Sequence, residues 1–169
     1  AFVALKTSTN DGHDFVNSAA SKGMSVAIVS AEAYAKNSDT WSGITLIEVT
    51  DPLEALGSWA AWHRNQMDIT VVCVTGSNGK TTVKNQIADS LSCRFATHKT
   101  SANLNNHIGV PLTLLEIEAH HEAAVIEIGM SHAGEISSLA QIAKPTVGVI
   151  TNTGHAHLEA FDSLDALID

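Results

Sequence analysis

Basic residues are scarce in this sequence of 169 residues. Nine Lys and Arg stand against eighteen Asp and Glu, which gives a formal net charge of −9. These basic side chains are too few to build a patch for nucleic acid or for an anionic membrane surface, so we expect neither partner. Long hydrophobic runs are lacking too. None approaches the ~20 apolar residues of a membrane-spanning helix, and no signal peptide is recognisable.

The sequence has only two cysteines, Cys73 and Cys93. They are too few for a disulfide framework and lack the spacing of a metal site, so we interpret both as reduced thiols of a cytoplasmic protein. We also expect a monomer. The chain starts inside an apolar run, at residues 1–5, without an initiator Met, and stops inside a plausible helix at residues 164–169. We therefore expect a fragment that is truncated at both ends.

One stretch, residues 69–82, organises the rest of the chain. Residues 69–74 form a continuous apolar, mostly β-branched run, which is typical of a strand buried on both faces. The loop Gly76-Ser77-Asn78-Gly79 follows, and Lys80-Thr81-Thr82 then opens a helix. Loop glycines let backbone N–H groups turn toward a phosphate, and a helix start adds unpaired donors. Since Lys80 adds a positive charge and Thr81 a hydroxyl for magnesium, the stretch predicts a nucleoside triphosphate site.

The loop departs from the common Walker A spacing, G-x-x-x-x-G-K-[ST]. Val74 stands where that pattern has its first glycine, so the loop is shorter. An alternative interpretation is a simple glycine turn between a core strand and a helix, with Lys80 on the solvated surface. The strand before the loop and the helix after it favour phosphate binding.

Strands and helices are predicted to alternate along the chain, which is typical of an α/β fold with parallel sheets. The predicted strands are residues 2–5, 25–29, 45–49, 69–74, 94–98, 123–128 and 146–150. The predicted helices are residues 14–22, a helix opening at Pro52, a helix opening at Lys80, a short helix from Gly109 to near Ile117, and residues 132–143. Residues 36–43 are expected to form a surface loop. We place a domain boundary near residue 68.

Two side chains follow predicted strands at the edge where open α/β sheets bind ligands. Glu127 lies near the end of one strand, where a carboxylate can hold magnesium or instead cap a helix or face solvent. His157 follows the strand 146–150 through a polar loop. Because Mg²⁺ prefers oxygen ligands, the residues alone favour a structural or solvent role for His157, and equally for His155.

The loop Val74–Thr82 resembles the nucleotide loop of the Mur ligases, the ATP-dependent amide-forming enzymes of peptidoglycan assembly; folylpolyglutamate synthases share it. Three further segments resemble the branch of the Mur ligases that joins D-alanyl-D-alanine to UDP-N-acetylmuramoyl-tripeptide. Residues 103–115 are similar to its N-L-N-N-x-I-G-V-P-x-T-L-L, and residues 125–129 with 134–136 to its V-I-E-x-G…G-E-I. Residues 156–161 are similar to its A-H-L-E-G-F, with Ala160 in place of the glycine. Residues 2–6 and 11–15 resemble its N-terminal substrate domain.

This resemblance implies a small N-terminal α/β substrate domain at 1–68 and a truncated P-loop-type, parallel-sheet ATP-binding domain at 69–169. It implies that ATP phosphates are bound by Gly76, Ser77, Asn78, Gly79, Lys80, Thr81 and Thr82. It also implies Mg²⁺ binding by Thr81, Glu127 and His157, catalytic roles for Lys80, Glu127 and His157, and substrate contacts for Asn105 and Asn106. The carbamylated lysine of the family, which helps hold a second metal ion, would fall beyond Asp169.

The implied reaction couples ATP to amide formation. ATP would convert the terminal carboxylate of the UDP-muramoyl-tripeptide into an acyl phosphate, which the amine of D-alanyl-D-alanine then attacks. The first step is phosphoryl transfer between anions, so catalysis depends mostly on positioning and charge neutralisation. Two other interpretations stay open. One is another Mur ligase or a folylpolyglutamate synthase, and the other, for this chain by itself, is a nucleotide-binding module without catalysis.

Overall fold

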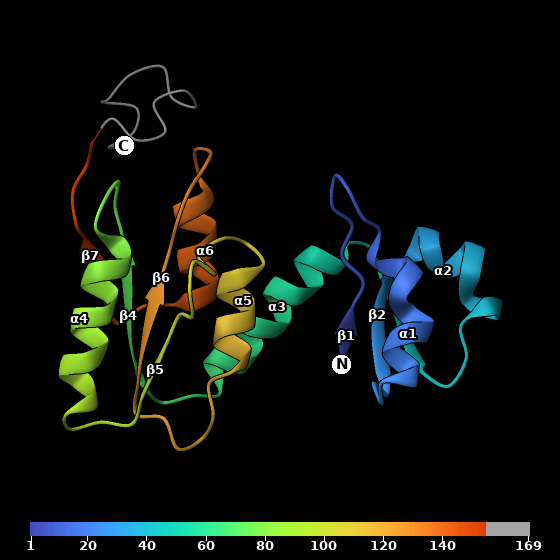
Figure 1. Ribbon diagram of the computed structural model, residues 1–169, viewed down its shortest axis with the longest axis horizontal. Helices are drawn as coiled ribbons and strands as arrows, with labels where there is room; N and C mark the ends of the chain where they lie inside the picture. Colours follow the sequence, from blue (N-terminus) through green and yellow to red (C-terminus); the bar gives the residue numbers. More distant parts are fainter. Residues whose placement is uncertain (155–169) are drawn as a thin grey trace. The chain divides into compact units, whose positions relative to one another are not determined.

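The computed structural model describes residues 1–154 and contains two compact units, Ala1–Leu56 and a second that begins at Gly57 (Figure 1). The sequence places the boundary near residue 68 instead, and the functional domains 1–68 and 69–169 stay a prediction. The strands of each sheet pair in parallel, so the predicted α/β class is confirmed. Among the helices of residues 1–154, none has both the length and the apolar character that crossing a membrane requires.

The first unit is built on a three-stranded sheet with the order β1-β2-β3. Its strands are β1 (Phe2–Val3), β2 (Val26–Ser30) and β3 (Thr45–Val49). Its helical segments are the 3-10 turns η1 (Gly12–Phe15) and η2 (Ser38–Thr40) and the helices α1 (Val16–Ser21) and α2 (Ala31–Asn37). A small core joins the sheet to α1 and consists of Ala4, Val16, Ala27 and Val29.

Sequence patterning predicted neither helix α2 nor the 3-10 turn η2 that follows it. The sequence analysis expected a surface loop at residues 36–43 and no helix between the strand 25–29 and that loop. The helix starts because the Ser30 hydroxyl accepts a hydrogen bond from the Ala33 N–H at 3.3 Å, as an N-cap residue does. None of its residues is buried, so it has no apolar stripe for a periodicity argument to detect.

The second unit is built on a four-stranded sheet with the order β5-β6-β4-β7. Its strands are β4 (Thr70–Thr75), β5 (Thr97–Lys99), β6 (Ala123–Glu127) and β7 (Val147–Ile150). Its helices are α3 (Pro52–Asn65, which begins in the first unit), α4 (Lys80–Ser92), α5 (Gly109–Leu115) and α6 (Glu135–Ala143). The central strand β4 has β6 on one side and β7 on the other, which makes its carboxyl end a point where the strand order reverses.

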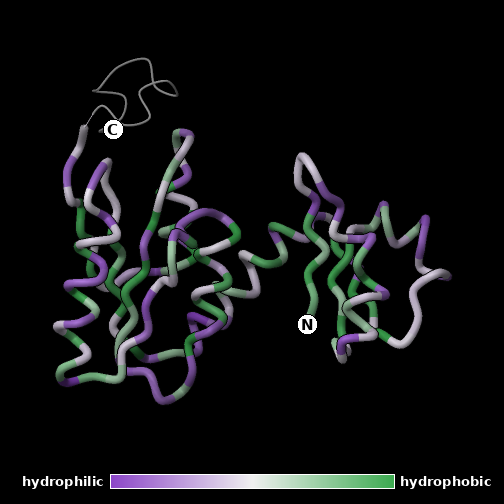
Figure 2. The backbone as a smooth tube through the Cα atoms, viewed as in Figure 1, coloured by the Kyte–Doolittle hydropathy of each residue, from purple (hydrophilic) through white to green (hydrophobic). Residues whose placement is uncertain are grey.

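Helices cover both faces of this sheet (Figure 1). Val72 and Val74 of β4 face α4, whereas Val71 and Cys73 face α3, α5 and α6. This alternation explains why β4 is a continuous apolar run, since both of its faces are buried. In Figure 2 the hydrophobic colouring accordingly follows the strands.

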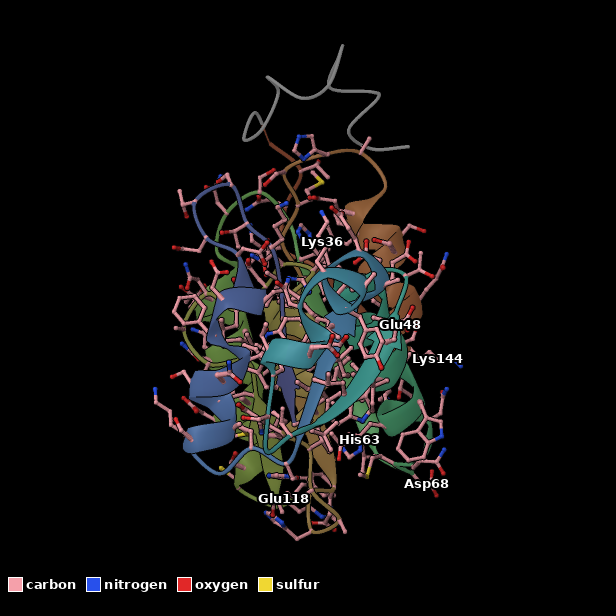
Figure 3. All side chains as sticks on the ribbon, turned by 90° about the vertical axis from the view of Figure 1, so that its right-hand side faces the viewer. Lys36, Glu48, His63, Asp68, Glu118 and Lys144 are labelled. Carbon is pink, nitrogen blue, oxygen red and sulfur yellow. The ribbon has the colours of Figure 1, made fainter. Side chains whose placement is uncertain are left out.

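Helix α3 begins as the sequence predicts and is tied to the second sheet at its end. The Asp51 carboxylate accepts a hydrogen bond from the Leu53 N–H at 2.7 Å and so caps the start of the helix. The His63 ring, labelled in Figure 3, lies with Nε2 2.8 Å from the Ile117 carbonyl. This contact is partly buried. Arg64 donates to the carbonyls of Met67, Ala143 and Lys144.

Candidate functional site

The predicted site residues come from neighbouring strand ends of the second sheet. Val74 of β4 pairs with Glu127 of β6, and Thr75 of β4 pairs with Ile150 of β7. The glycine loop leaves β4 directly after this point, and the carboxyl ends of parallel strands share one edge of the sheet. The topology therefore brings the loop, Glu127 and the segment after β7 together.

The loop between β4 and α4 depends on its two glycines. Gly76 has φ +130° and Gly79 has φ +79°, which side-chain-bearing residues rarely adopt. A Cβ at Gly76 would also lie 2.3 Å from the Thr151 hydroxyl and 2.8 Å from the Asn152 carbonyl. The loop thus passes against the segment after β7 with no room for a side chain at Gly76.

Asn152, which the sequence analysis did not single out, holds the outer part of this loop. Its carbonyl accepts the Ser77 N–H at 3.0 Å, and its Oδ1 accepts the Asn78 N–H at 3.0 Å. Its amide group also donates to the Asn78 carbonyl at 3.2 Å. The main-chain donors of Ser77 and Asn78 are therefore occupied, and those of residues 79–82, at the start of α4, have no partner within residues 1–154.

Lys80 lies over the loop that precedes it. Its Nζ donates to the Gly76 carbonyl at 2.6 Å and to the Ser77 carbonyl at 3.3 Å. The ammonium group is thus held beside the unpartnered N–H groups of the helix start. A helix N-terminus with an adjacent lysine is an environment that favours a phosphate.

Glu127 is almost completely buried, with 1% of its surface exposed, and polar groups meet it from two sides. The Thr81 hydroxyl donates to Oε2 at 2.9 Å, and the Asn105 amide group donates to Oε1 at 2.9 Å. The structure therefore brings Thr81, Asn105 and Glu127 together at the start of α4. Gly129 makes room for Asn105, since a Cβ there would lie 2.9 Å from its side chain.

Asn106 has a different place. Its Oδ1 accepts the N–H groups of Ile108 and Gly109 at 3.1 and 2.9 Å, and so it caps the start of α5. Its substrate contact stays a prediction. His157 and His155 lie outside the described residues.

Lys84 is the functional candidate that sequence reasoning missed. Its side chain is 2% exposed, and its Nζ lies 3.6 Å from Glu127 Oε2. The available signal was its position, one helical turn after Lys80 and one turn before Ala88, on the side of α4 that faces the sheet. When the buried face of α4 is defined only by Val83, Ile87 and Leu91, Lys84 is assigned to the surface.

The donor set at the site suits magnesium. Thr81 and Glu127 supply a hydroxyl and a carboxylate, the hard oxygen ligands that Mg²⁺ takes together with water and phosphate oxygens. Within residues 1–154, no three His, Cys, Asp or Glu side chains gather into a metal site made of protein ligands alone. A magnesium ion here would need phosphate oxygens or further ligands from outside the described residues.

Comparison with known proteins agrees with this geometry. The Mur ligase middle domain matches residues 74–169, more than half of the chain. UDP-N-acetylmuramoyl-tripeptide–D-alanyl-D-alanine ligases are similar over nearly the whole chain: those of Escherichia coli and Buchnera aphidicola are each 40% identical over 163 residues, 96% of this chain and 34% of theirs. The chain thus spans about a third of the length of these relatives.

Solved structures give the same result. A crystal structure of MurF from Acinetobacter baumannii is 38% identical and superposes with a TM-score of 0.87, covering 98% of this chain and 35% of its own. MurF from Thermotoga maritima, solved in complex with ADP, is 34% identical with a TM-score of 0.86, covering 99% and 38%. By its middle-domain sequence and by its fold, the chain belongs to the Mur ligase family.

Proposed function

We propose that the full-length protein is an ATP-dependent ligase that joins D-alanyl-D-alanine to UDP-N-acetylmuramoyl-tripeptide. The relatives that match nearly the whole chain carry that name, and one structural relative was solved with ADP. The observation that carries the proposal is the buried Glu127 carboxylate, 2.9 Å from the Thr81 hydroxyl at the start of α4. This arrangement puts an oxygen ligand pair beside unpartnered helix N–H groups, as a magnesium–nucleotide complex requires.

In the proposed reaction a carboxylate oxygen of the tripeptide attacks the γ-phosphorus of ATP, and ADP leaves. The amine nitrogen of D-alanyl-D-alanine then attacks the acyl carbon, phosphate leaves, and the nitrogen loses a proton as the amide forms. The residues of this chain act in the first step by positioning and neutralising phosphate charge: the N–H groups of residues 79–82 and the Lys80 ammonium would hold the phosphates. Mg²⁺, when held by Thr81 and Glu127, would supply further charge neutralisation.

Several finer assignments belong to the same proposal. They are Mg²⁺ dependence, a cytoplasmic monomer, and a role in cell-wall synthesis and through it in cell shape and division. Part of the site would come from regions outside this chain, since the chain covers only 34% of its relatives in E. coli and Buchnera aphidicola. For residues 1–169 in isolation we therefore expect weak Mg–ATP binding and no turnover.

Lys80→Ala in the full-length protein tests the proposal. Phosphate release from ATP should require both substrates, and a panel of other amines (L-alanine, D-glutamate, diaminopimelate) should not replace D-alanyl-D-alanine. Lys80→Ala should lower the rate by roughly a hundred- to a thousandfold, because it removes a charge aimed at the transferred phosphate.

The matched control is Lys99→Ala, which removes an exposed ion pair with Asp89 at 3.1 Å on the neighbouring edge strand. Exposed ion pairs contribute little to the free energy of folding, so the stability and the reaction rate of Lys99→Ala should stay near those of the wild type. A wild-type rate in Lys80→Ala, or release with a different amine only, would contradict the proposed function.

A further inference from the structure

The largest side chain buried completely within residues 1–154 is a lysine. Lys84 of α4 donates to the Thr100 carbonyl at 2.8 Å and to the Ala102 carbonyl at 3.4 Å, and its Nζ lies 3.6 Å from Glu127 Oε2. The ammonium group thus has three oxygen partners and almost no solvent. Lys84 itself takes no part in the proposed phosphate contacts.

Stability alone does not explain a charge at this position. A buried ion pair loses much of its attraction to desolvation, and well-packed apolar residues of similar volume often serve as well or better. The rest of this face of α4 is apolar, with Val83, Ile87 and Ala88 against the sheet. A lysine here therefore suggests a requirement for a fixed charge and fixed geometry beside Glu127.

The two carboxylate oxygens of Glu127 have different side-chain partners. Thr81 and Lys84 are three residues apart on one face of α4, and both approach Oε2. Asn105 holds Oε1. Lys84 also holds the segment that leads to Asn105, including Ala102, whose φ of +47° is uncommon for a residue with a side chain. Lys84 thus supports the carboxylate directly and through the segment that carries its other partner.

We infer that Lys84 is a positioning residue that fixes the Glu127 carboxylate, and the segment from Thr100 to Asn105, in the orientation that accepts a divalent cation with Thr81. The inference rests on the proposed metal role of Glu127. Groups that hold a metal-binding carboxylate from behind are typically worth about ten- to a hundredfold in metal affinity. Loss of positive charge by itself would act in the opposite direction, since it strengthens attraction for a cation, so the sign of the change is informative.

The experiment measures Mn²⁺ binding to the full-length protein with saturating ADP, by electron paramagnetic resonance of free Mn²⁺. Lys84→Met removes both the charge and the donors, whereas Lys84→Gln keeps a donor for the two carbonyls. We expect Mn²⁺ affinity to fall about ten- to a hundredfold in Lys84→Met and less in Lys84→Gln. Lys99→Met, at an exposed ion pair on β5, is the matched control and should bind as wild type.

Unchanged or tighter Mn²⁺ binding in Lys84→Met overturns the inference. Glu127→Gln distinguishes failure of this inference from failure of the proposed function. If Glu127→Gln and Lys84→Met both bind Mn²⁺ normally, the proposed metal site is wrong. If Glu127→Gln loses Mn²⁺ binding and Lys84→Met does not, only the role of Lys84 is wrong.

The effect on folding stability is measured by urea unfolding of the double variant Lys84→Met/Glu127→Gln, which removes the positive and the negative charge of the pair. Because the cost of Lys84→Met should come from an unpaired Glu127, the double variant should be more stable to urea than Lys84→Met. Equal or lower stability overturns the pairing on which the inference depends.

Discussion

Gly76 and Gly79 lie in the same loop, but each position requires glycine for a different reason. Gly79 has φ +79° with open space where a Cβ would be, whereas Gly76 combines φ +130° with backbone and side-chain atoms within 3.0 Å of that position. Gly79→Ala should therefore cost only the left-handed backbone penalty, about 1–2 kcal/mol. Gly76→Ala should cost at least about 3 kcal/mol, because it must also displace the segment after β7. Urea unfolding of the two variants measures the difference, and equal losses would show that the close approach to Thr151 and Asn152 is unimportant.

His157 is a prediction from resemblance alone, and it can be tested against its neighbour His155. If His157 is a metal ligand, His157→Ala should raise the Mg²⁺ concentration for half-maximal activity of the full-length enzyme more than His155→Ala does. The reason is that only a ligand contributes directly to holding the ion, whereas a loop histidine does not. Mg²⁺ titrations of the two variants at saturating ATP supply the measurement. Equal shifts would remove His157 from the metal site.

At the scale of elements, local patterns predicted what depends on local chemistry. The strand, glycine loop and helix around Gly76 and Gly79 were predictable because burial on both faces, positive φ and a helix start each have a sequence signature. Two edge strands are shorter than predicted, since β1 spans Phe2–Val3 and β5 spans Thr97–Lys99, whereas the edge strand β3 keeps its predicted bounds, Thr45–Val49.

Tertiary partners explain what patterns could not predict. Lys84 and Asn152 matter through residues far along the chain, Glu127 for the first and the Gly76–Gly79 loop for the second. No periodicity encodes such pairings. The proximity of Thr81 to Glu127 was expected only because parallel strand ends share an edge, and the structure gives the hydrogen bond that the rule cannot.

Strand β5 carries a histidine whose protonation should weaken the second unit. His98 lies half-buried with Nε2 3.0 Å from the Thr113 carbonyl, 4.0 Å from Glu116 and beside the His121 ring. Burial, and then the charge of His121, lower the pKa of His98 below its usual value, although Thr113 and Glu116 oppose the shift. Since the pKa is lower in the folded state, the stabilisation is present above pH ~6.5, the unfolded value, and is lost as the pH falls toward the folded pKa.

Urea unfolding at pH 7.5 and 5.5 tests this prediction. Wild type should lose more stability between the two pH values than His98→Gln, in which the titrating group is removed. His132→Gln changes an exposed imidazole and serves as the control, with the wild-type loss expected to remain. Glu118, labelled in Figure 3, donates its N–H to Nδ1 of His121, and His98 pairs with Ala124 near the start of β6, whereas the glycine loop follows the end of β4. Nucleotide binding should therefore be unaffected by His98→Gln.

At the scale of the whole molecule, residues 1–154 contain three hydrophobic clusters that do not share residues. One consists of Ala4, Val16, Ala27 and Val29 in the first unit. The other two clusters line the faces of the second sheet, where β4 contributes Val71 and Cys73 to one face and Val72 and Val74 to the other. Separate cores predict that each unit can lose stability independently.

Cys73 makes this independence measurable. It lies in the central strand β4 and is 6% exposed, and burial raises the pKa of its thiol to about 12 despite the nearby Arg64 charge. A thiol reagent should therefore modify exposed Cys93 quickly and Cys73 only when β4 opens. Saturating ADP with Mg²⁺ should slow the Cys73 reaction in proportion to [ADP]/Kd, about a hundredfold at 100 times Kd, because the nucleotide binds only the closed state.

The control is Val29→Ala, which opens a cavity in the core of the first unit and should leave the rate of Cys73 modification unchanged. Peptide mapping of the full-length protein by mass spectrometry resolves the two cysteines. A Cys73 rate that ignores the nucleotide would argue against binding at the β4–α4 loop, and a rate that rises in Val29→Ala would show that the two units open together.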